Sequence, residues 1–343
     1  IGPASLNAEQ TQAHKNALRA FVLGGAELQG AAKERYAAIQ ERLAEITQKF
    51  SENTLDATDS FALYVSEDQL QGVPADVDTH AYASLVDLMQ ESFKLFGDKT
   101  AFSFLGRGLT YRELDRLSQV FAAYLQSLGL VFGDRVAIML PNTLQYPIAV
   151  AAILRAGFVV VNINPLYTPR ELELQLKDAD AKAIIILENF GASLQECLAR
   201  TPIKHIVLCA MGDRLGWIKG ALVNHVVRRI KKMVPPFVLP TAVRFNEALA
   251  QGERCTLVLP EIDGDDLAVL QYTGGTTGVA KGAELLHRNL VANMLQASEW
   301  CGPALKRIPA HEQPTFVCAL PLYHIFAFNV NLLSCMQIGR AHV

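Results

Sequence analysis

The sequence has no long apolar run. No stretch approaches the roughly 18 consecutive apolar residues of a membrane-spanning helix, and no secretory signal peptide is visible. The six cysteines are scattered without a Cys-x-x-Cys pair, which argues against a disulfide framework and favours a reducing compartment. A net charge of −3 gives no reason to expect nucleic acid as a partner.

Three common functional motifs are also missing. No Gly-Lys pair is followed by Ser or Thr, as a Walker loop requires, and no Gly-x-Gly-x-x-Gly turn of the dinucleotide-binding type is present. The nearest approach to a zinc-binding His-Glu-x-x-His motif is His311-Glu-Gln-Pro-Thr315, which lacks the second histidine. These absences exclude a Walker-type nucleotidase and a zinc peptidase of that class, and we predict no metal-ligating residues in the chain.

The most informative stretch that is present is a loop rich in glycine and threonine, Gln271-Tyr-Thr-Gly-Gly-Thr-Thr-Gly-Val-Ala-Lys-Gly282. Four glycines let backbone N–H groups approach an anion, the threonines add hydroxyl donors, and Lys281 adds a positive charge. The preceding run Leu267-Ala-Val-Leu270 predicts a short buried strand, so the loop leaves a strand end, where α/β folds hold ligands. We predict a phosphate cradle made of Tyr272, Thr273, Gly274, Gly275, Thr276, Thr277, Gly278, Lys281 and Gly282.

This loop resembles the signature of the adenylate-forming enzymes, which include acyl-CoA synthetases, luciferases and the adenylation domains of peptide synthetases. Their usual pattern is Thr-Ser-Gly-Thr-Thr-Gly-x-Pro-Lys-Gly, and this chain has Gly274 for the Ser and Ala280 for the Pro. A second element, Ala319-Leu-Pro-Leu-Tyr-His-Ile-Phe326, resembles the family's Leu-Pro-x-x-His block. The resemblance implies that the cradle binds the phosphates of ATP and that His324 borders the acyl pocket and the adenylation centre.

Further blocks resemble bacterial long-chain fatty-acid–CoA ligases, from about Pro74 to about Gln337. The resemblance implies an enzyme of the bacterial cytoplasm that joins ATP and a long-chain fatty acid into an acyl-adenylate and then transfers the acyl group to coenzyme A. AMP and pyrophosphate are the other products, and Mg²⁺ is the expected metal. Backbone donors and Lys281 would stabilise the charge on the pyrophosphate leaving group. The blocks are Leu109–Leu114, Gly133–Asn142, Gln145–Pro147 and Asn162–Leu172.

The same region has the pattern of an α/β fold. Short, uncharged, mostly β-branched runs at residues 136–139, 159–161, 183–187 and 206–208 predict buried parallel strands. Helical patterns fill the intervals, at residues 111–128, 145–156, 169–178 and 193–200. The alternation predicts layered sheets with flanking helices. The resemblance identifies this region as an incomplete amino-terminal domain of an adenylate-forming enzyme.

Residues 1–74 have a different pattern, which predicts an all-α segment. A narrow apolar stripe at helical spacing (Tyr36, Ile39, Leu43, Ile46 and Phe50) needs a partner to cover it. The plainer interpretation is a bundle or dimerisation helix, but residues 1–72 also resemble the amino-terminal helices of oligopeptidase A, a thimet-type zinc metallopeptidase. Without a His-Glu-x-x-His motif, no peptidase activity is expected.

The organisation along the chain therefore predicts three parts. They are residues 1–74, residues 75–337 and a tail at residues 338–343, Ile-Gly-Arg-Ala-His-Val, which matches one reading frame of a common sequencing adapter. We interpret the junction near residues 71–76 as an assembly or cloning chimera. The resemblance implies that the adenine-binding block, the magnesium-binding Glu and the small carboxy-terminal domain lie beyond Val343. We therefore expect weak nucleotide binding at best and negligible turnover.

One segment, Trp217–Val234, predicts a basic amphipathic helix. Ile218, Leu222, Val226 and Ile230 recur at helical spacing, and Arg228, Arg229, Lys231 and Lys232 are interspersed among them before Pro235 and Pro236 end the pattern. The plainer interpretation is a surface helix that docks its apolar side on the domain. The alternative is peripheral attachment to the anionic inner membrane.

Two other functions stay open. A medium-chain or aryl-acid adenylate-forming ligase would carry the same phosphate loop. A non-catalytic helical interaction protein built on residues 1–74 is the third hypothesis.

Overall fold

The computed structural model describes residues 81–273, 281–305 and 315–337 continuously, and residues 29–31, 33–35, 38–39, 42, 78, 307 and 341–342 singly or in short pieces. The chain divides into two compact units, Ile1–Leu70 with Gly275–Gly278 and Gln71–Gly274 with Val279–Val343. The described residues of the first unit are helical at 30–31, 33–35, 38–39 and 42, and Ile39 is exposed. The rest of the apolar stripe predicted there lies outside the described residues.

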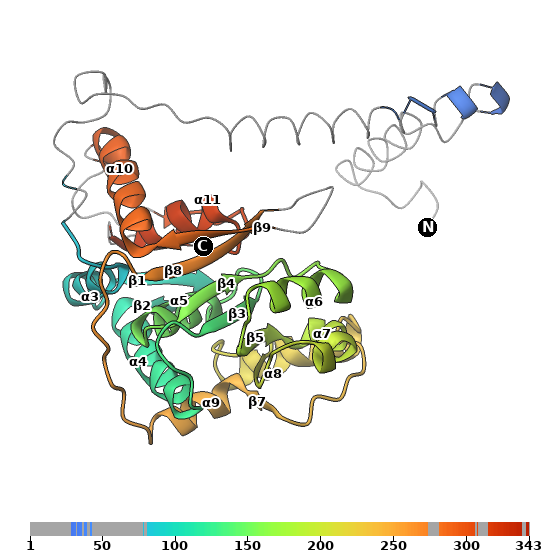
Figure 1. The fold of residues 1–343 in the computed structure, drawn as a ribbon, viewed down its shortest axis with the longest axis horizontal. Coiled ribbons are helices and arrows are strands. Elements are labelled where there is room, and N and C mark those ends of the chain that lie inside the picture. The colour runs from blue at the N-terminus through green and yellow to red at the C-terminus, as the bar shows by residue number, and fades with distance from the viewer. Residues whose placement is uncertain are drawn as a thin grey trace. The chain divides into compact units, whose positions relative to one another are not determined.

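The second unit is built on a seven-stranded sheet in the order β7-β6-β5-β3-β4-β8-β9 (Figure 1). Neighbouring strands are parallel from β7 to β8, and β9 is antiparallel to β8. All four predicted buried strands are confirmed, because each run lies in this sheet with buried side chains. The strands are β3 (Arg135–Met139), β4 (Val159–Asn162), β5 (Ala183–Leu187), β6 (His205–Cys209), β7 (Ala242–Arg244), β8 (Leu267–Thr273) and β9 (Lys281–Leu286).

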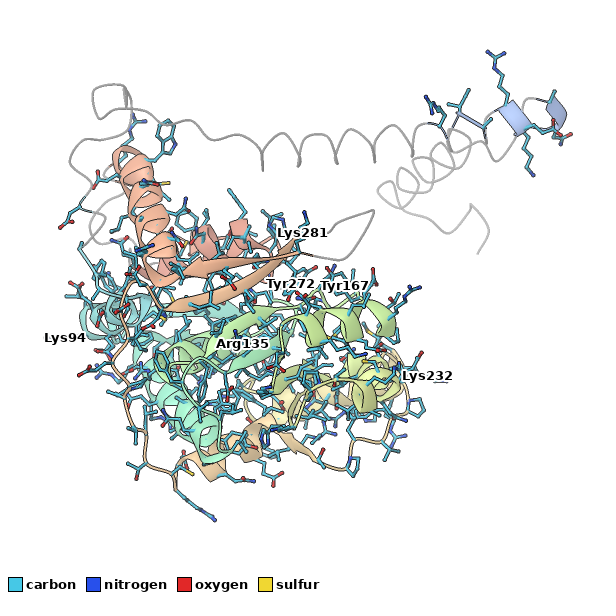
Figure 2. The ribbon with its side chains drawn as sticks, viewed as in Figure 1. Lys94, Arg135, Tyr167, Lys232, Tyr272 and Lys281 are labelled. Atoms are coloured by element: carbon cyan, nitrogen blue, oxygen red, sulfur yellow. The ribbon has the colours of Figure 1, made fainter. Side chains whose placement is uncertain are left out.

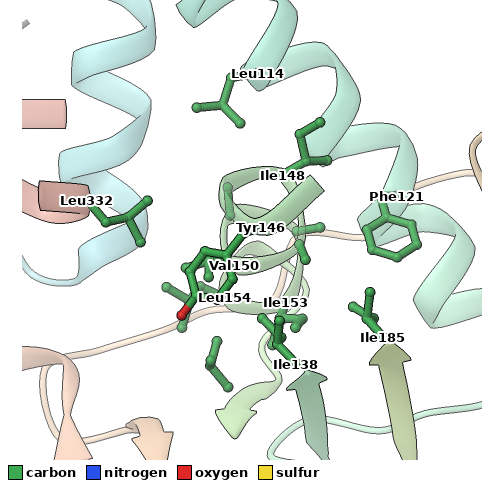
Figure 3. Close-up of a cluster of buried hydrophobic side chains, with 14 of the residues drawn as sticks. Leu114, Phe121, Ile138, Tyr146, Ile148, Val150, Ile153, Leu154, Ile185 and Leu332 are labelled. Carbon is green, nitrogen blue, oxygen red and sulfur yellow. The ribbon is translucent and has the colours of Figure 1, made fainter. Parts of the chain in front are cut away.

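Helices cover both faces of this sheet, which confirms the predicted α/β class. Successive strand residues point to opposite faces, so that Ile138 packs in one core and Met139 in the other. Figure 3 shows the first core, where Phe121 and Ile148 lie above Ile138 and Ile185. That core contains α3 (Leu85–Phe96), α4 (Tyr111–Ser127), α5 (Gln145–Arg155), α9 (Phe245–Gly252) and the start of α10 (His287–Leu305); the second contains α6 (Pro169–Asp178) and α7 (Gly191–Cys197).

Local sequence signals set the helix boundaries. The side chain of Thr168 accepts a hydrogen bond from the backbone N–H of Glu171, whose carboxylate accepts one from the N–H of Thr168, with Pro169 in the first turn. The predicted helix at 169–178 is confirmed to the residue, and those at 111–128 and 145–156 to within one. The pattern at 193–200 corresponds to α7 followed by a 3₁₀ turn, η4 (Leu198–Arg200).

The remaining elements lie around this core. A second sheet has the order β10-β11-β1-β2, with β1 and β2 antiparallel. Its strands are β1 (Thr100–Phe104), β2 (Arg107–Thr110), β10 (Thr315–Phe316) and β11 (Ala341–His342). The other described elements are the turn η3 (Glu188–Phe190), α8 (Trp217–His225), the π-helix η5 (Val226–Ile230), α11 (Ile325–Ala327), the π-helix η6 (Phe328–Ser334) and α12 (Cys335–Gln337).

The connections place a ligand-binding edge between β3 and β4. β3 is followed by α5 on one face of the sheet, whereas β4 is followed by α6 on the other. In open α/β sheets the crevice beyond the carboxyl ends of two such strands is where ligands bind. The carboxyl end of β8 lies at the same edge, because β8 is parallel to β4.

Candidate functional site

The two stems of the glycine-rich loop lie side by side at this edge. β8 ends at Thr273 and β9 begins at Lys281, and the strand register pairs these two residues and pairs Tyr272 with Gly282. Figure 2 labels Tyr272 and Lys281 on these strands. Four of the predicted ligands therefore belong to described strands. The other five, Gly274, Gly275, Thr276, Thr277 and Gly278, lie outside the described residues, so the phosphate-binding role of the loop stays a prediction.

Tyr272 fixes the stem of the loop to the neighbouring helix. Its hydroxyl donates a hydrogen bond to Asp178 Oδ2 at 2.6 Å, at the end of α6. Burial, followed by the contact with Asp178, raises the pKa of Tyr272, so the hydroxyl keeps its proton. Its ring packs on Gly282, where an added Cβ would lie 2.9 Å from Tyr272 Cζ. A Cβ at position 282 would therefore force this ring or the strand to shift.

Lys281 is available to an anionic ligand. It is exposed at the first position of β9, and no ion-pair partner is found for it among the residues that the structure describes. An unpaired ammonium group on a flexible stem is suited to a phosphate. Lys281 is the register partner of Thr273, the last residue of β8, so it lies beside the start of the predicted cradle.

His324 lies at the start of α11, on an exposed turn. Its Nδ1 accepts a hydrogen bond from the backbone N–H of Phe326 at 3.4 Å, which caps this short helix. Nε2 is therefore the ring nitrogen left for solvent or a ligand. The role of His324 in the acyl pocket stays a prediction.

Asn142 holds the segment that leads to His324. Its side-chain Nδ2 donates to the carbonyl oxygens of Cys318 at 3.0 Å and Leu320 at 2.9 Å. Its Oδ1 accepts from the backbone N–H of Leu322 at 2.8 Å. Asn142 follows β3, so this amide attaches residues 318–322 to the carboxyl edge of the sheet.

A buried series of three side chains, which we call the amide relay (Tyr146, Asn162 and Gln271), continues this attachment. The Tyr146 hydroxyl lies 2.6 Å from Asn162 Oδ1 and 2.9 Å from the Leu322 carbonyl oxygen. Asn162 Nδ2 donates to Gln271 Oε1 at 3.1 Å, and Gln271 Nε2 donates to the Tyr323 carbonyl at 3.1 Å. The three side chains are at most 6% exposed, and they join α5, β4 and β8 to the residues before His324.

The amide relay was missed as functional by the sequence analysis, although a signal for it exists. Asn162 ends the apolar run of β4, and Gln271 interrupts that of β8. A polar residue at the carboxyl end of a buried strand needs a partner when it is buried. The partners here are more than 100 positions apart along the chain for Asn162 and Gln271, so spacing alone does not reveal them.

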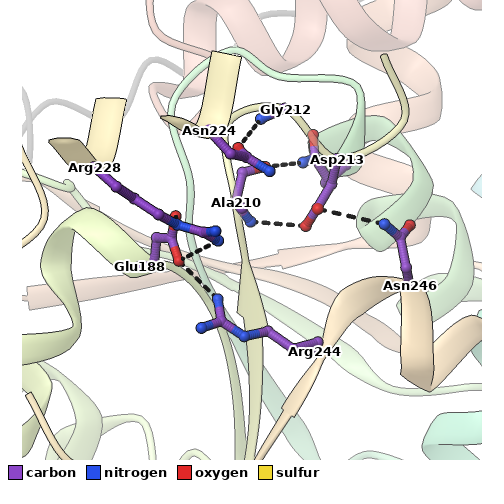
Figure 4. Close-up of polar contacts among 9 residues, drawn as sticks. Glu188, Ala210, Gly212, Asp213, Asn224, Arg228, Arg244 and Asn246 are labelled. Carbon is purple, nitrogen blue, oxygen red and sulfur yellow. Dashed lines mark hydrogen bonds and ion pairs between the residues drawn. The ribbon is translucent and has the colours of Figure 1, made fainter. Parts of the chain in front are cut away.

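The basic amphipathic segment forms α8 and η5, and it docks by a small and polar side. Gly220, Asn224 and Arg228 are spaced four apart, and Figure 4 shows Asn224 and Arg228 facing the domain, while the neighbouring Val223 packs against the core. Gly220 touches backbone, because an added Cβ would lie 2.4 Å from the Gly212 carbonyl oxygen. Asn224 Oδ1 accepts from the N–H of Gly212 at 2.7 Å.

An ion cluster, which we call the Glu188 cluster (Glu188, Arg228 and Arg244), completes this docking. Arg228 donates to both carboxylate oxygens of Glu188, at 2.7 and 2.9 Å, and Arg244 donates to Oε2 at 2.7 Å. The Glu188 side chain is only 2% exposed. Its carboxylate therefore depends on the two guanidinium groups for the charge partners that water would supply.

The predicted docking of the apolar side is wrong for three of its four residues. Ile218 is 65% exposed, Leu222 61% and Ile230 64%, while Val226 is partly buried. The physical reason is that Gly220 allows a close backbone contact and Arg228 meets a buried carboxylate, so the opposite side of the helix turns outward. Trp217, at 86% exposure, stands beside these residues.

Among the residues that the structure describes, no group of three His, Cys, Asp or Glu side chains is placed to hold a metal ion. No helix among the described residues is long and apolar enough to cross a membrane.

Comparison with known proteins agrees with this geometry. The sequence profile of the AMP-binding enzymes matches residues 89–343. A long-chain-fatty-acid–CoA ligase of Escherichia coli O157:H7 is 51% identical over 268 residues, which are 78% of this chain and 47% of that protein. The corresponding ligase of Haemophilus influenzae is 49% identical over 265 residues, 77% of this chain and 47% of that protein.

Solved structures give the same fold. The crystal structure of a long-chain-fatty-acid–CoA ligase from Archaeoglobus fulgidus matches with a TM-score of 0.58 and 23% identity, over 76% of this chain and 46% of that one. At that identity the likeness establishes the fold alone. The chain spans about half the length of the curated relatives that it matches.

Proposed function

The chain belongs to the AMP-binding enzyme family, and on that basis we propose that it is part of an ATP-dependent long-chain fatty-acid–CoA ligase. The observation that carries this proposal is the 51% identity to such a ligase over 78% of the chain. The proposed reaction joins a long-chain fatty acid, ATP and coenzyme A into acyl-CoA, with AMP and pyrophosphate as products. Because the chain spans 47% of that relative, the proposal concerns the whole enzyme, and we expect this chain alone to have negligible turnover.

The described residues fit the phosphates of ATP. Both loop stems meet at the carboxyl edge of the sheet, and Lys281 is exposed there without an ion-pair partner among the described residues. ATP supplies the phosphorus that is attacked and the pyrophosphate that leaves. Lys281 holds negative charge near the loop, and Tyr272 keeps the stem in place through Asp178. Mg²⁺ enters the proposal only through the family resemblance.

His324 is proposed to border the acyl group and the adenylation centre. Support comes from the amide relay and from Asn142, which attach the residues before His324 to β3, β4 and β8. The same strands carry the edge at which the loop begins. The chain's own residues would therefore orient the acid relative to the phosphates, and orientation of this kind is a large part of catalysis.

We also propose that the enzyme works in the bacterial cytoplasm, with peripheral contact to the inner membrane through Trp217–Val234. Support comes from the outward side of α8, where Trp217, Ile218 and Leu222 are each more than 60% exposed. Exposed large apolar side chains beside basic ones are typical of helices that lie in a membrane interface.

ATP binding by the chain itself tests the cradle. NMR titration of the folded chain with ATP is expected to give weak binding, and Lys281→Gln is expected to weaken it about tenfold, or about 1.4 kcal/mol. Lys94→Gln, at an exposed lysine of α3, is the matched control and should bind ATP as the unchanged chain does. Equal binding by the Lys281 and Lys94 variants would contradict the role of Lys281.

Acyl-CoA formation tests the substrate class separately. A hybrid protein joins residues 75–337 to the missing half of the 51% identical relative. It is expected to use palmitate and oleate in preference to octanoate and benzoate. A preference for octanoate or benzoate would favour the medium-chain or aryl-acid ligase instead. No described feature favours the interaction-protein hypothesis, because most of residues 1–74 lie outside the described residues.

The division of the chain stays a proposal as well. We propose that residues 1–74 come from an oligopeptidase A-like gene, joined near residues 71–76 to the ligase region, and that residues 338–343 are adapter-derived. A single-molecule DNA read through the codons for residues 60–90 and past residue 337 tests both. One uninterrupted molecule that encodes the sequence as written would overturn the chimera.

A further inference from the structure

A broad cleft lies beside α8. It has a volume of about 1000 Å³ and is bounded by α8, the turn at residues 212–216, α4 and α9. Most of its charged lining is basic: Arg107, Arg116, Arg214, His225, Arg228 and Arg229 against Asp213 and Glu253. Nothing in the proposed ligase reaction uses this cleft.

Three of the arginines already have partners. Arg107 pairs with Glu113 at 2.9 Å, and Arg116 pairs with Glu253 at 3.3 Å. Arg228 belongs to the Glu188 cluster. These three guanidinium groups are neutralised by the protein and do not by themselves call for a ligand.

Arg214 and Arg229 differ from them. Neither has an ion pair among the residues that the structure describes, and the buried Nε of Arg214 has no hydrogen-bond partner there. The adjacent carboxylate of Asp213 makes no hydrogen bond to Arg214 among the described residues; it accepts from the Ala210 N–H at 2.7 Å and from Asn246 at 3.3 Å (Figure 4). A buried donor without a partner is costly, and an acceptor bound at this side chain would offset that cost.

The electrostatics around Arg214 agree with that geometry. Burial, and after it the positive charge of Arg116, lower the pKa of Arg214, while the carboxylates of Glu113 and Asp213 act in the opposite direction. Its backbone φ of +68° is also unusual for a residue with a side chain. Arg214 is thus a partly desolvated positive charge in the cleft, which a bound anion would stabilise.

The lining of the cleft includes an exposed large apolar side chain, with further exposed apolar residues beside it on α8. Trp217 lines the cleft and is 86% exposed, and Ile218 and Leu222 follow on the outward side of α8. Lys231 and Lys232, just beyond η5, are exposed as well. Indole rings prefer the boundary between headgroups and acyl chains, and lysines prefer an anionic surface.

We propose that this cleft binds the phosphate of an anionic phospholipid headgroup in a bilayer, with Arg214 and Arg229 as its ligands and Trp217, Ile218 and Leu222 inserted among the lipids beside it. The inference rests on the membrane contact proposed above and adds a specific lipid site to it. The small and polar inner side of α8, held by Gly220, Asn224 and Arg228, fixes which side of the helix meets the lipid.

Vesicle binding by the whole chain tests this site. Fluorescence of Trp217 is followed in a Trp300→Phe background, with vesicles of phosphatidylcholine alone or mixed with phosphatidylglycerol. We expect the mixed vesicles to bind and shift the emission to the blue, and Arg214→Gln to weaken binding about fivefold. Arg229→Gln is expected to act in the same direction, and since Arg229 is exposed it remains informative if Arg214→Gln disturbs folding. Arg112→Gln, at an exposed arginine paired with Asp98, is the control and should leave binding unchanged.

Each outcome separates the site from the membrane contact. If Ile218→Ser with Leu222→Ser abolishes binding while Arg214→Gln and Arg229→Gln match the control, the headgroup site is wrong and the membrane contact stands. If the unchanged chain binds neither vesicle, both are wrong. If inorganic phosphate at the same phosphate concentration competes fully with the mixed vesicles, the cleft is a site for free anions and the lipid assignment is wrong.

Discussion

The carboxyl edge of the large sheet is held together in two different ways. At the carboxyl ends of β3, β4 and β8, neutral side chains of the amide relay and Asn142 attach the residues before His324. At the carboxyl ends of β5, β6 and β7, the Glu188 cluster and Asp213 attach α8 and the turn at 210–215. The first half positions groups near a proposed reaction centre, and the second positions a helix whose outer side is exposed.

The difference teaches what each chemistry provides. Hydrogen bonds between neutral groups fix short distances without adding a charge to a site where charge develops during reaction. A buried carboxylate between two arginines binds strongly to both, but it becomes a large cost when either partner is removed. Neutral hydrogen-bonding groups suit a site to which no fixed charge should be added, whereas an ion cluster suits a contact that holds one helix in one orientation.

The largest effect is expected when the charge partners of Glu188 are removed from the charged half. Arg228→Met with Arg244→Met leaves the Glu188 carboxylate buried and unpaired, so the free energy of unfolding is expected to fall by about 3 kcal/mol. Arg107→Met with Arg112→Met removes two exposed ion pairs and should cost less than about 1 kcal/mol. Urea denaturation measures both, and equal losses would show that the Glu188 cluster is no anchor.

A pH titration provides a reference for this comparison, because the residue that titrates belongs to neither half of the carboxyl edge. His287 is 2% exposed at the opposite edge, where its Nδ1 accepts from the N–H of Leu85 at 3.1 Å. Burial lowers the pKa of His287 to about 4. The native state therefore binds fewer protons than the unfolded state, in which the pKa is about 6.5, and stability is lost as the pH falls through 6.5 toward 4.

Between pH 7.5 and pH 5 this loss is expected to be about 2 kcal/mol, measured by urea denaturation at each pH. His287→Gln offers an amide acceptor without this titration and should flatten the profile. An unchanged slope in the variant would assign the loss to other groups.

A smaller effect is expected when one hydroxyl is removed from the neutral half. Tyr146→Phe removes the hydroxyl that contacts Asn162 and Leu322, and the free energy of unfolding is expected to fall by about 1.5 kcal/mol. Tyr124→Phe, at an equally buried tyrosine of α4 outside the amide relay, is the control and should cost less. In the hybrid enzyme, Tyr146→Phe should also lower kcat, and a cost in stability alone would reduce the relay to a packing element.

The smallest expected effect concerns the loop stem. Gly282→Ala adds a Cβ that meets the ring of Tyr272, so we expect a loss of about 1 kcal/mol in stability and weaker ATP binding. Gly302→Ala places the same methyl group on α10 with nothing but its chain neighbours nearby; Pro303 follows, which offsets the gain in helix propensity, so the change in stability should be close to zero. An equally small change for Gly282→Ala in a thermal melt would mean that Tyr272 moves aside freely.

The sequence predicted the parts of this fold whose signals are local. Uncharged β-branched runs identified the parallel strands, and Pro169 followed by the acidic Glu171 and Glu173 marked the start of α6, because these patterns depend on neighbours along the chain. The amide relay was missed because its members come from distant elements and contact one another only in the folded sheet.

The error at α8 has a different cause. Apolar periodicity identifies an apolar side but does not show whether that side faces the domain. The spacing of Gly220, Asn224 and Arg228, each four residues after the last, was equally visible in the sequence and marks the side that docks. Its meaning depends on the buried carboxylate of Glu188, which lies 40 positions earlier.

The hydroxyl of Tyr146 has one proton and two acceptors within reach. Burial raises the pKa of Tyr146 well above its usual value, so that proton is retained. If residues 320–323 move away, the hydroxyl can still donate to Asn162, and no buried donor is left without a partner at this position. The bonds that Asn142 makes to the same segment have no such alternative partner among the residues that the structure describes, so this amide, more than Tyr146, holds the residues before His324 in place.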